Sequence, residues 1–160
     1  MHDRKLIHLD VEDRLRALAQ LPLLANVSPR ERRELADKAH ILGFDDGEPI
    51  VLEGEEGLGF YLILSGSVAV RQKGAIVNRI EAGGFFGEVS LIEGVPRTAD
   101  VIADGPTVCL GLLRSDFKRM LVREPRVAMT ILEEEGRRLV GGPLVESPAP
   151  SDGPDGSLPE

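Results

Sequence analysis

The middle of the chain consists of short apolar runs separated at regular intervals by glycine turns, and this pattern constrains the fold more than any other. The apolar runs fall within residues 41–44, 50–52, 60–64, 68–70 and 76–80, and the turns between them carry Gly47, Gly54, Gly66 and Gly74. Two further runs follow, around 99–103 and 108–113. Runs of this length with turn signals between them are typical of antiparallel strands in a sandwich or roll.

Helical signals flank this strand region on both sides. Asp10 is a candidate N-cap for a helix that ends before Pro22, and the segment 28–31 (Ser-Pro-Arg-Glu) has the form of a capping box. After the strands, Ser115 is expected to cap one helix and Pro125 to begin another. The charged run 133–138 of that last helix is interpreted as a solvated face.

Length and charge narrow the class of protein. A chain of 160 residues is long enough for one domain with a hydrophobic core. Its formal net charge of −8 disfavours a basic nucleic-acid-binding face. The single cysteine, Cys109, lies in an apolar run and is interpreted as a small buried hydrophobe. No secretion signal and no apolar run long enough for a membrane span is visible, so a cytoplasmic protein without a membrane partner is expected.

The chain divides into three parts. Residues 1–23 form an N-terminal helical segment, 24–140 form the domain, and 141–160 form a Pro/Gly-rich tail that carries acidic residues and no basic ones. A segment of that composition cannot bury a core, so the tail is expected to be disordered.

The segment 83–101 holds the most informative chemistry. Three glycines and two phenylalanines precede a short helix-like run, and Glu88 and Arg97 are charged residues in an otherwise apolar segment. Buried ions are costly, so these two either pair with each other or face a polar ligand between them. Gly87 allows a ligand to approach the backbone, and the forked guanidinium of Arg97 suits phosphate oxygens.

These residues resemble the phosphate-binding cassette of the cyclic nucleotide-binding domains found in bacterial catabolite-activator-like regulators and eukaryotic cyclic-nucleotide-dependent kinases. The resemblance covers roughly residues 24–138 and is carried by the glycine framework, by Phe86-Gly87-Glu88 and by Arg97-Thr98-Ala99. It implies a mainly β fold, namely an antiparallel β-roll (jelly-roll-like, a double-stranded β-helix) with N-terminal helices and C-terminal lid helices.

The resemblance also implies ligand-binding roles for individual residues. Glu88 would accept the ribose 2'-hydroxyl and Arg97 would bind the exocyclic phosphate oxygens. Backbone N–H groups near Gly87, Val89 and Ala99 would complete the anion site. The hydroxyl of Thr98 would reach the phosphate or the purine, which leaves cAMP and cGMP both open as ligands.

The base is expected to lie against aliphatic side chains. By the same resemblance Val70 and Val77 would line the base pocket, and the last helix would close over the purine. No aromatic residue follows Phe117, so Leu132 or Leu139 would have to provide the lid contact.

The sequence therefore predicts a cyclic nucleotide sensor that is not an enzyme, needs no cofactor besides its cAMP or cGMP ligand, and acts through a protein partner or a homodimer. One alternative is a degenerate structural roll that no longer binds nucleotide. A cupin-like metalloenzyme is a weaker alternative, because His2, His8 and His40 form no H-x-H pair and no metal site is expected. A DNA-binding regulator would need a helix-turn-helix where the tail begins at Gly141.

Overall fold

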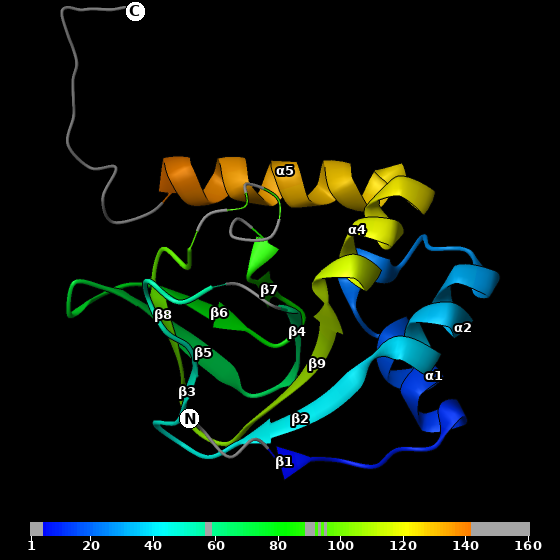
Figure 1. Cartoon of the computed structure of the whole chain (residues 1–160), viewed down its shortest axis with the longest axis horizontal. Helices are drawn as coiled ribbons and strands as arrows, with labels where there is room; N and C mark the ends of the chain where they lie inside the picture. Colours follow the sequence, from blue (N-terminus) through cyan, green and yellow to red (C-terminus); the bar gives the residue numbers. More distant parts are fainter. Residues whose placement is uncertain (1–4, 57–58, 89–91, 93, 95, 142–160) are drawn as a thin grey trace, which may run out of the picture.

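Two antiparallel sheets pack face to face in the computed structural model, which describes residues 5–56, 59–88, 92, 94 and 96–141 (Figure 1). The first sheet has the order β1-β2-β9-β4-β7, formed by Lys5–Leu6, His40–Phe44, Thr107–Leu113, Gly59–Ser65 and Phe85–Phe86. The second has the order β3-β8-β5-β6, formed by Pro49–Val51, Asp100–Ala103, Ser67–Gln72 and Ala75–Glu81. The antiparallel β-roll expected from the glycine-spaced runs is confirmed.

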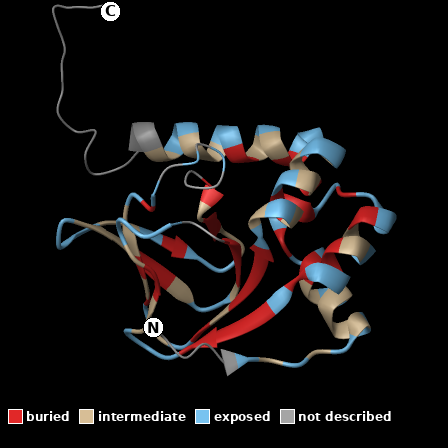
Figure 2. Cartoon of the chain, in the orientation of Figure 1, coloured by how far each residue is buried: buried red, intermediate tan, exposed pale blue. Residues whose placement is uncertain are grey.

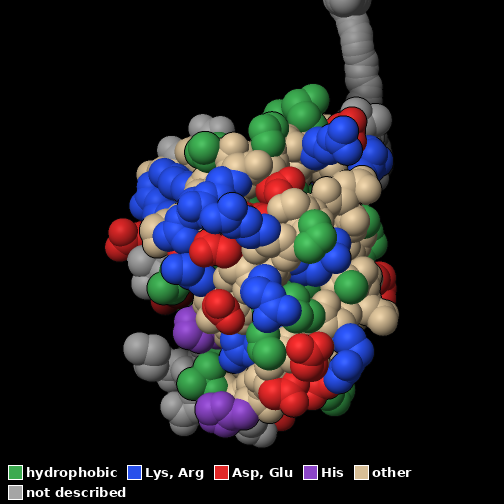
Figure 3. Space-filling view, turned by 90° about the vertical axis from the view of Figure 1, so that its right-hand side faces the viewer, with side chains coloured by type: hydrophobic (Ala, Val, Ile, Leu, Met, Phe, Trp, Pro, Cys, Tyr) green, Lys and Arg blue, Asp and Glu red, His purple; other side chains and the backbone are tan. Residues whose placement is uncertain are grey.

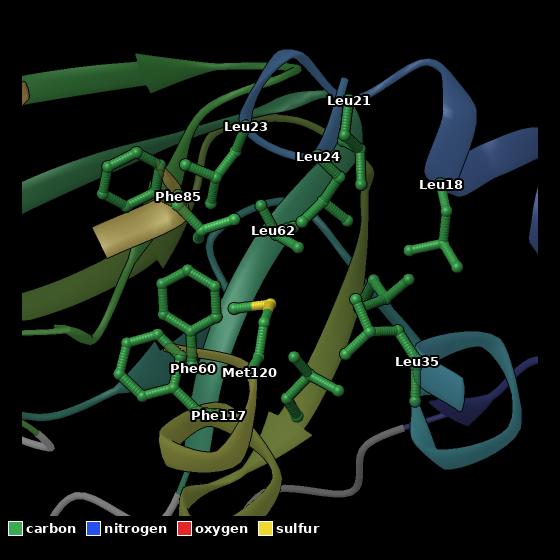
Figure 4. Packing of buried hydrophobic residues seen from close by; sticks show 14 of the residues in the cluster. Leu18, Leu21, Leu23, Leu24, Leu35, Phe60, Leu62, Phe85, Phe117 and Met120 are labelled. Carbon is green, nitrogen blue, oxygen red and sulfur yellow. The ribbon is translucent and has the colours of Figure 1, made fainter. Parts of the chain in front are cut away.

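Strand alternation divides the apolar side chains between two cores. Along β4, Phe60 and Leu62 face the helices, whereas Tyr61 and Ile63 point into the space between the sheets. Figure 4 shows the helix-side core, where the ring of Phe60 stacks on Phe117 with centroids 4.3 Å apart. Figure 2 shows that buried residues continue along the strands. Cys109 is fully buried in the inner core, which confirms its interpretation as a hydrophobe.

The helices begin largely where capping residues predict. Helix α1 (Val11–Ala19) follows Asp10, whose side chain accepts from the Asp13 N–H, and α2 (Pro29–Lys38) follows Ser28, which accepts from the Glu31 N–H. A 3-10 turn, η1 (Pro22–Leu24), links them. The expected cap at Ser115 is wrong. Strand β9 runs to Leu113 and α4 (Arg114–Arg123) begins directly after it without a side-chain cap.

The last helix, α5 (Pro125–Gly141), begins at Pro125 as expected and lies across the roll above β7 (Figure 1). Its first half packs on α4 and η1, and Val127 and Ile131 are buried in the helix-side core. This placement brings its second half over the segment that follows β7.

Basic side chains gather on the face formed by α2 and α4 (Figure 3). Carboxylates are interspersed with them, since Arg123 lies 3.6 Å from Glu31 and 3.1 Å from Glu34. Ion pairs of this kind reduce the positive potential that an anionic polymer would experience.

The turn between β4 and β5 provides a test of the fold. Gly66 has φ +87°, and a Cβ there would lie 2.4 Å from the Pro106 carbonyl oxygen. We expect Gly66→Ala to lower the free energy of unfolding by roughly 3 kcal/mol, because left-handed strain and a backbone clash add together. Gly74→Ala is the matched control, with φ +84° and nothing within 4 Å, and should cost only about 1 kcal/mol. Equal urea midpoints for the two variants would contradict the close approach.

Candidate functional site

The site is built around the turn after β7. Phe86 stacks on Tyr61 with ring centroids 5.0 Å apart, which fixes the end of the strand. Gly87 then takes φ +98°, and a Cβ there would lie 2.9 Å from both Arg97 Nη1 and the Gly59 carbonyl oxygen. Only glycine therefore fits where the chain turns from β7 toward Glu88.

Arg97 lies beside this turn and is only 6% exposed. Its Nη1 donates to the Gly87 carbonyl oxygen at 3.0 Å and its Nη2 to that of Gly59 at 2.7 Å. Its own backbone is anchored by hydrogen bonds with Gly54 and Glu55. The guanidinium is thus oriented in advance, which reduces the entropy lost when an anion binds.

A small pocket of about 130 Å³ opens above Arg97. Most of the ligand-binding residues expected from the sequence line it, namely Phe86, Gly87, Glu88, Arg97, Thr98 and Ala99, together with Val70. Val89 lies outside the described residues. The cassette and one base-pocket residue are therefore brought together by the fold.

Two of the expected base-pocket residues are placed elsewhere. The register of β5 and β6 pairs Val70 with Asn78, and it is Asn78 and Ile80 that line the pocket in place of Val77. Successive strand residues point to opposite faces, so a shift of one residue accounts for the difference. Leu132 is 58% exposed on α5 and is not part of the lining.

Glu88 is paired with a residue that the sequence interpretation assigned to solvent. It is 2% exposed, and its Oε2 accepts from Arg138 Nη1 at 3.0 Å. Arg138 also donates from Nη2 to the Phe85 carbonyl oxygen at 2.6 Å and lies over the Phe85 ring. The interpretation of 133–138 as a solvated face is therefore wrong at Arg138, whose side chain is only 23% exposed.

The helical spacing of residues in the sequence could have indicated that Arg138 lies on the buried face of α5. Residues 127, 131 and 138 recur on one face of a helix, and Val127 and Ile131 are buried. Arg138 continues that buried face, so its guanidinium points toward the roll.

Burial determines the ionisation of Glu88. The pKa of Glu88 is raised from 4.5 to about 7, chiefly by desolvation and then by a hydrogen bond with the Glu135 side chain. The positive charge of Arg138 lowers the pKa in part. A carboxyl group in this position changes its charge close to neutral pH.

A larger cleft of about 500 Å³ lies beside the small pocket, between α5, η1 and the turn after β6. Asn78, Ile80 and Arg138 line both. The Arg138 side chain is therefore placed where the two spaces meet, and its displacement would change the room available above Glu88.

The described part of the chain offers neither a candidate metal site nor a candidate membrane-spanning helix. Over those residues, no group of three or more His, Cys, Asp or Glu side chains could hold a metal ion. None of the helices described is long and apolar enough to cross a membrane.

Comparison with known proteins gives a consistent family assignment. The model of the cyclic nucleotide-binding domain matches residues 42–124. A cAMP-dependent protein kinase regulatory subunit from Mucor circinelloides f. lusitanicus is 33% identical over 108 residues, covering 65% of this chain and 25% of that protein. This chain thus matches about a quarter of the length of that relative.

Solved structures are similar over most of the chain. The regulatory domain of Toxoplasma gondii PKA with cAMP is 30% identical with a TM-score of 0.71, over 79% of this chain and 50% of that one. The regulatory subunit of a cAMP-independent protein kinase A from Trypanosoma brucei is 28% identical with a TM-score of 0.71, over 79% of this chain and 46% of that one.

Proposed function

This chain belongs to the cyclic nucleotide-binding domain family, and we propose that it binds cAMP or cGMP in the pocket above Arg97 and regulates a partner. The family is a regulatory, ligand-binding one, and the Mucor relative is a regulatory subunit. The observation that carries the proposal is the convergence of Gly87, Glu88 and the oriented guanidinium of Arg97 on one pocket. This arrangement offers a cation for phosphate and a carboxylate for a sugar hydroxyl.

In the proposed complex the phosphate lies on Arg97 and on backbone N–H groups near Gly87, Val89 and Ala99. The ribose hydroxyl is accepted by Glu88, and the base extends toward Val70. Thr98 is exposed at the pocket edge, where its hydroxyl is within the reach expected for phosphate or purine. A hydroxyl at this place suits either base.

Binding is proposed to move α5. A pocket of about 130 Å³ is smaller than the roughly 300–1,000 Å³ typical of small-molecule sites. Arg138 also donates a hydrogen bond to the Glu88 carboxylate, which accepts the ribose hydroxyl in the proposed complex. A nucleotide that prefers the displaced position of α5 by a few kcal/mol would shift the population of that helix.

The regulatory output is proposed to pass through a protein partner or a homodimer in the cytoplasm. Val122, Met129 and Leu132 are exposed apolar residues on α4 and α5. Their exposure changes if α5 moves, which gives a partner a surface that depends on the ligand.

Calorimetric titration with cAMP and cGMP tests the proposal. Saturable binding of either nucleotide with one site per chain would support it, and equal affinities would show that Thr98 does not select the base. Binding of neither would favour the degenerate roll, an alternative suggested by the Trypanosoma brucei relative, which is described as cAMP-independent.

Leu132→Ala tests whether α5 closes over the base. We expect the variant to bind nucleotide roughly five- to thirtyfold more weakly, because burying a leucine side chain against the base contributes about 1–2 kcal/mol. The unfolding midpoint without ligand should not change, since Leu132 is exposed in the free protein. Met129→Ala, also exposed and one turn earlier on α5, is the control and should bind normally. Equal loss in both variants would contradict a lid role for Leu132.

A further inference from the structure

Two carboxyl groups meet beneath α5 in a way that the ribose-binding role of Glu88 does not explain. Glu88 Oε1 and Glu135 Oε2 are both enclosed, and neither has a donor partner among the described residues. A hydrogen bond with the Glu135 side chain is nevertheless one cause of the raised pKa of Glu88. Carboxylate oxygens only accept, so a hydrogen bond between them requires a proton on one of the two groups.

The guanidinium groups near the pair favour ionisation of Glu88, whereas its burial and the second carboxyl group favour retention of the proton. Arg138 from α5 contacts the other oxygen of Glu88, Oε2, and its Nε lies 3.8 Å from Glu134. Arg97 lines the same pocket from the opposite side, where it bonds to the carbonyls of Gly87 and Gly59. The residues that face Glu88 from β6, Asn78 and Ile80, are uncharged.

At the α5 end of the pocket Glu134 is paired with the exposed Arg137 at 2.8 Å, so Arg138 remains the guanidinium in contact with Glu88. Burial opposes the ionisation of Glu88, and two carboxylates in contact cannot both ionise at low cost, so one proton shared between Glu88 and Glu135 relieves their repulsion. The raised pKa of Glu88 is consistent with this arrangement.

We propose that Glu135 is a positioning residue that shares one proton with Glu88, and that the ribose hydroxyl of a bound nucleotide displaces Glu135 and releases this proton. The inference rests on the proposed function. In the free protein the proton joins Glu88 Oε1 to Glu135 Oε2 and holds α5 on the roll. In the complex the hydroxyl donates to Glu88 instead, Glu88 is fully ionised, and Glu135 moves into solvent with the proton lost to water.

The expected consequence is nucleotide affinity that depends on pH. As pH rises toward the pKa of Glu88 at about 7, nucleotide affinity should rise up to about tenfold per pH unit, because one proton leaves for each nucleotide bound. Well above that pKa the affinity should become constant, since Glu88 is already ionised in the free protein. In Glu135→Gln the amide donates to Glu88 without a titrating proton, so the dependence should flatten.

Calorimetry of cAMP and cGMP binding at pH 6, in two buffers of different ionisation enthalpy, measures the protons released. We expect the wild-type chain to release most of one proton, Glu135→Gln to release little, and the exposed neighbour variant Glu133→Gln to match wild type. Equal release by wild type and Glu135→Gln would overturn the proposal. A parallel loss of affinity in Glu135→Gln at every pH would also overturn it, because only a structural role would then remain.

A measurement without ligand separates this inference from the proposed function. A proton retained only by the folded state makes the wild type lose stability as pH rises from about 4.5 to about 7, and Glu135→Gln should lose less over that range. If neither nucleotide binds, the proposed function and the coupling to it both fail, while the slopes of urea midpoint against pH still decide whether the proton is shared. Identical slopes in wild type and Glu135→Gln would overturn the shared proton itself.

Discussion

Arg97→Ala is expected to weaken cyclic nucleotide binding by roughly 30- to 5,000-fold, which corresponds to the 2–5 kcal/mol lost when one partner of a buried, hydrogen-bonded charge pair is truncated. Arg97 is almost fully enclosed and its guanidinium is oriented by two carbonyl oxygens. The phosphate of a bound nucleotide would lose both its bidentate donor and its counter-charge. Calorimetric titration of wild type and variant with the same nucleotide measures the effect.

Two further variants isolate the cause of that loss. Arg97→Lys keeps the charge but not the fork, so it should bind more tightly than Arg97→Ala and more weakly than wild type. Arg79→Ala removes an exposed arginine that pairs with Asp104 on the second sheet, and it should bind normally. Urea denaturation must accompany the titrations, because Arg97→Ala also loses hydrogen bonds to Gly87 and Gly59. A folded Arg97→Ala variant with wild-type affinity would rule out the phosphate role.

The cassette could be predicted from sequence because its constraints are local. The turn at Gly87 and the charges at Glu88 and Arg97 stand out against apolar neighbours within a short segment. Their convergence on one pocket follows from the roll, whose strands were recognisable from apolar runs and glycine turns. Local backbone requirements and the cost of burying charge were sufficient to single out this segment, and the resemblance to cyclic nucleotide-binding domains supplied the roles expected of its residues.

The partner of Glu88 could not be predicted in the same way, because it depends on the packing of a helix 50 residues later in the chain. Helical spacing places Arg138 on the buried face of α5, but only the docking of α5 over β7 brings it to Glu88. Glu135 shares this dependence. Whether Val77 or Asn78 faces the pocket depends instead on the register of β6. Apolar and polar residues do not alternate strictly along this strand, so the sequence does not determine which face is buried.

Arg138→Ala is expected to reduce the free energy of unfolding by roughly 2–3 kcal/mol at pH 7, because Glu88 stays buried without its counter-ion and the bond to the Phe85 carbonyl is lost. The loss is limited because Glu88 can take up a proton instead. Without Arg138 the pKa of Glu88 should rise above about 7, since the guanidinium is the charge that lowers it. Hydrogen exchange of the α5 amides should become faster as the helix loses this contact.

The sign of the pH dependence distinguishes this mechanism from a simple loss of packing. A carboxyl whose pKa is higher in the folded state stabilises fully below its unfolded pKa of 4.5, and this stability is lost as pH rises through the folded value. The destabilisation by Arg138→Ala should therefore be larger at pH 8 than at pH 6, by up to about 1.4 kcal/mol per pH unit. Arg137→Ala, which removes an exposed arginine paired with Glu134, is the matched control and should cost at most about 1 kcal/mol at either pH. In a Glu88→Gln background, the destabilisation caused by Arg138→Ala should no longer depend on pH. If Glu88 is present and the destabilisation is nevertheless equal at pH 6 and pH 8, packing and not the buried carboxylate holds α5 on the roll.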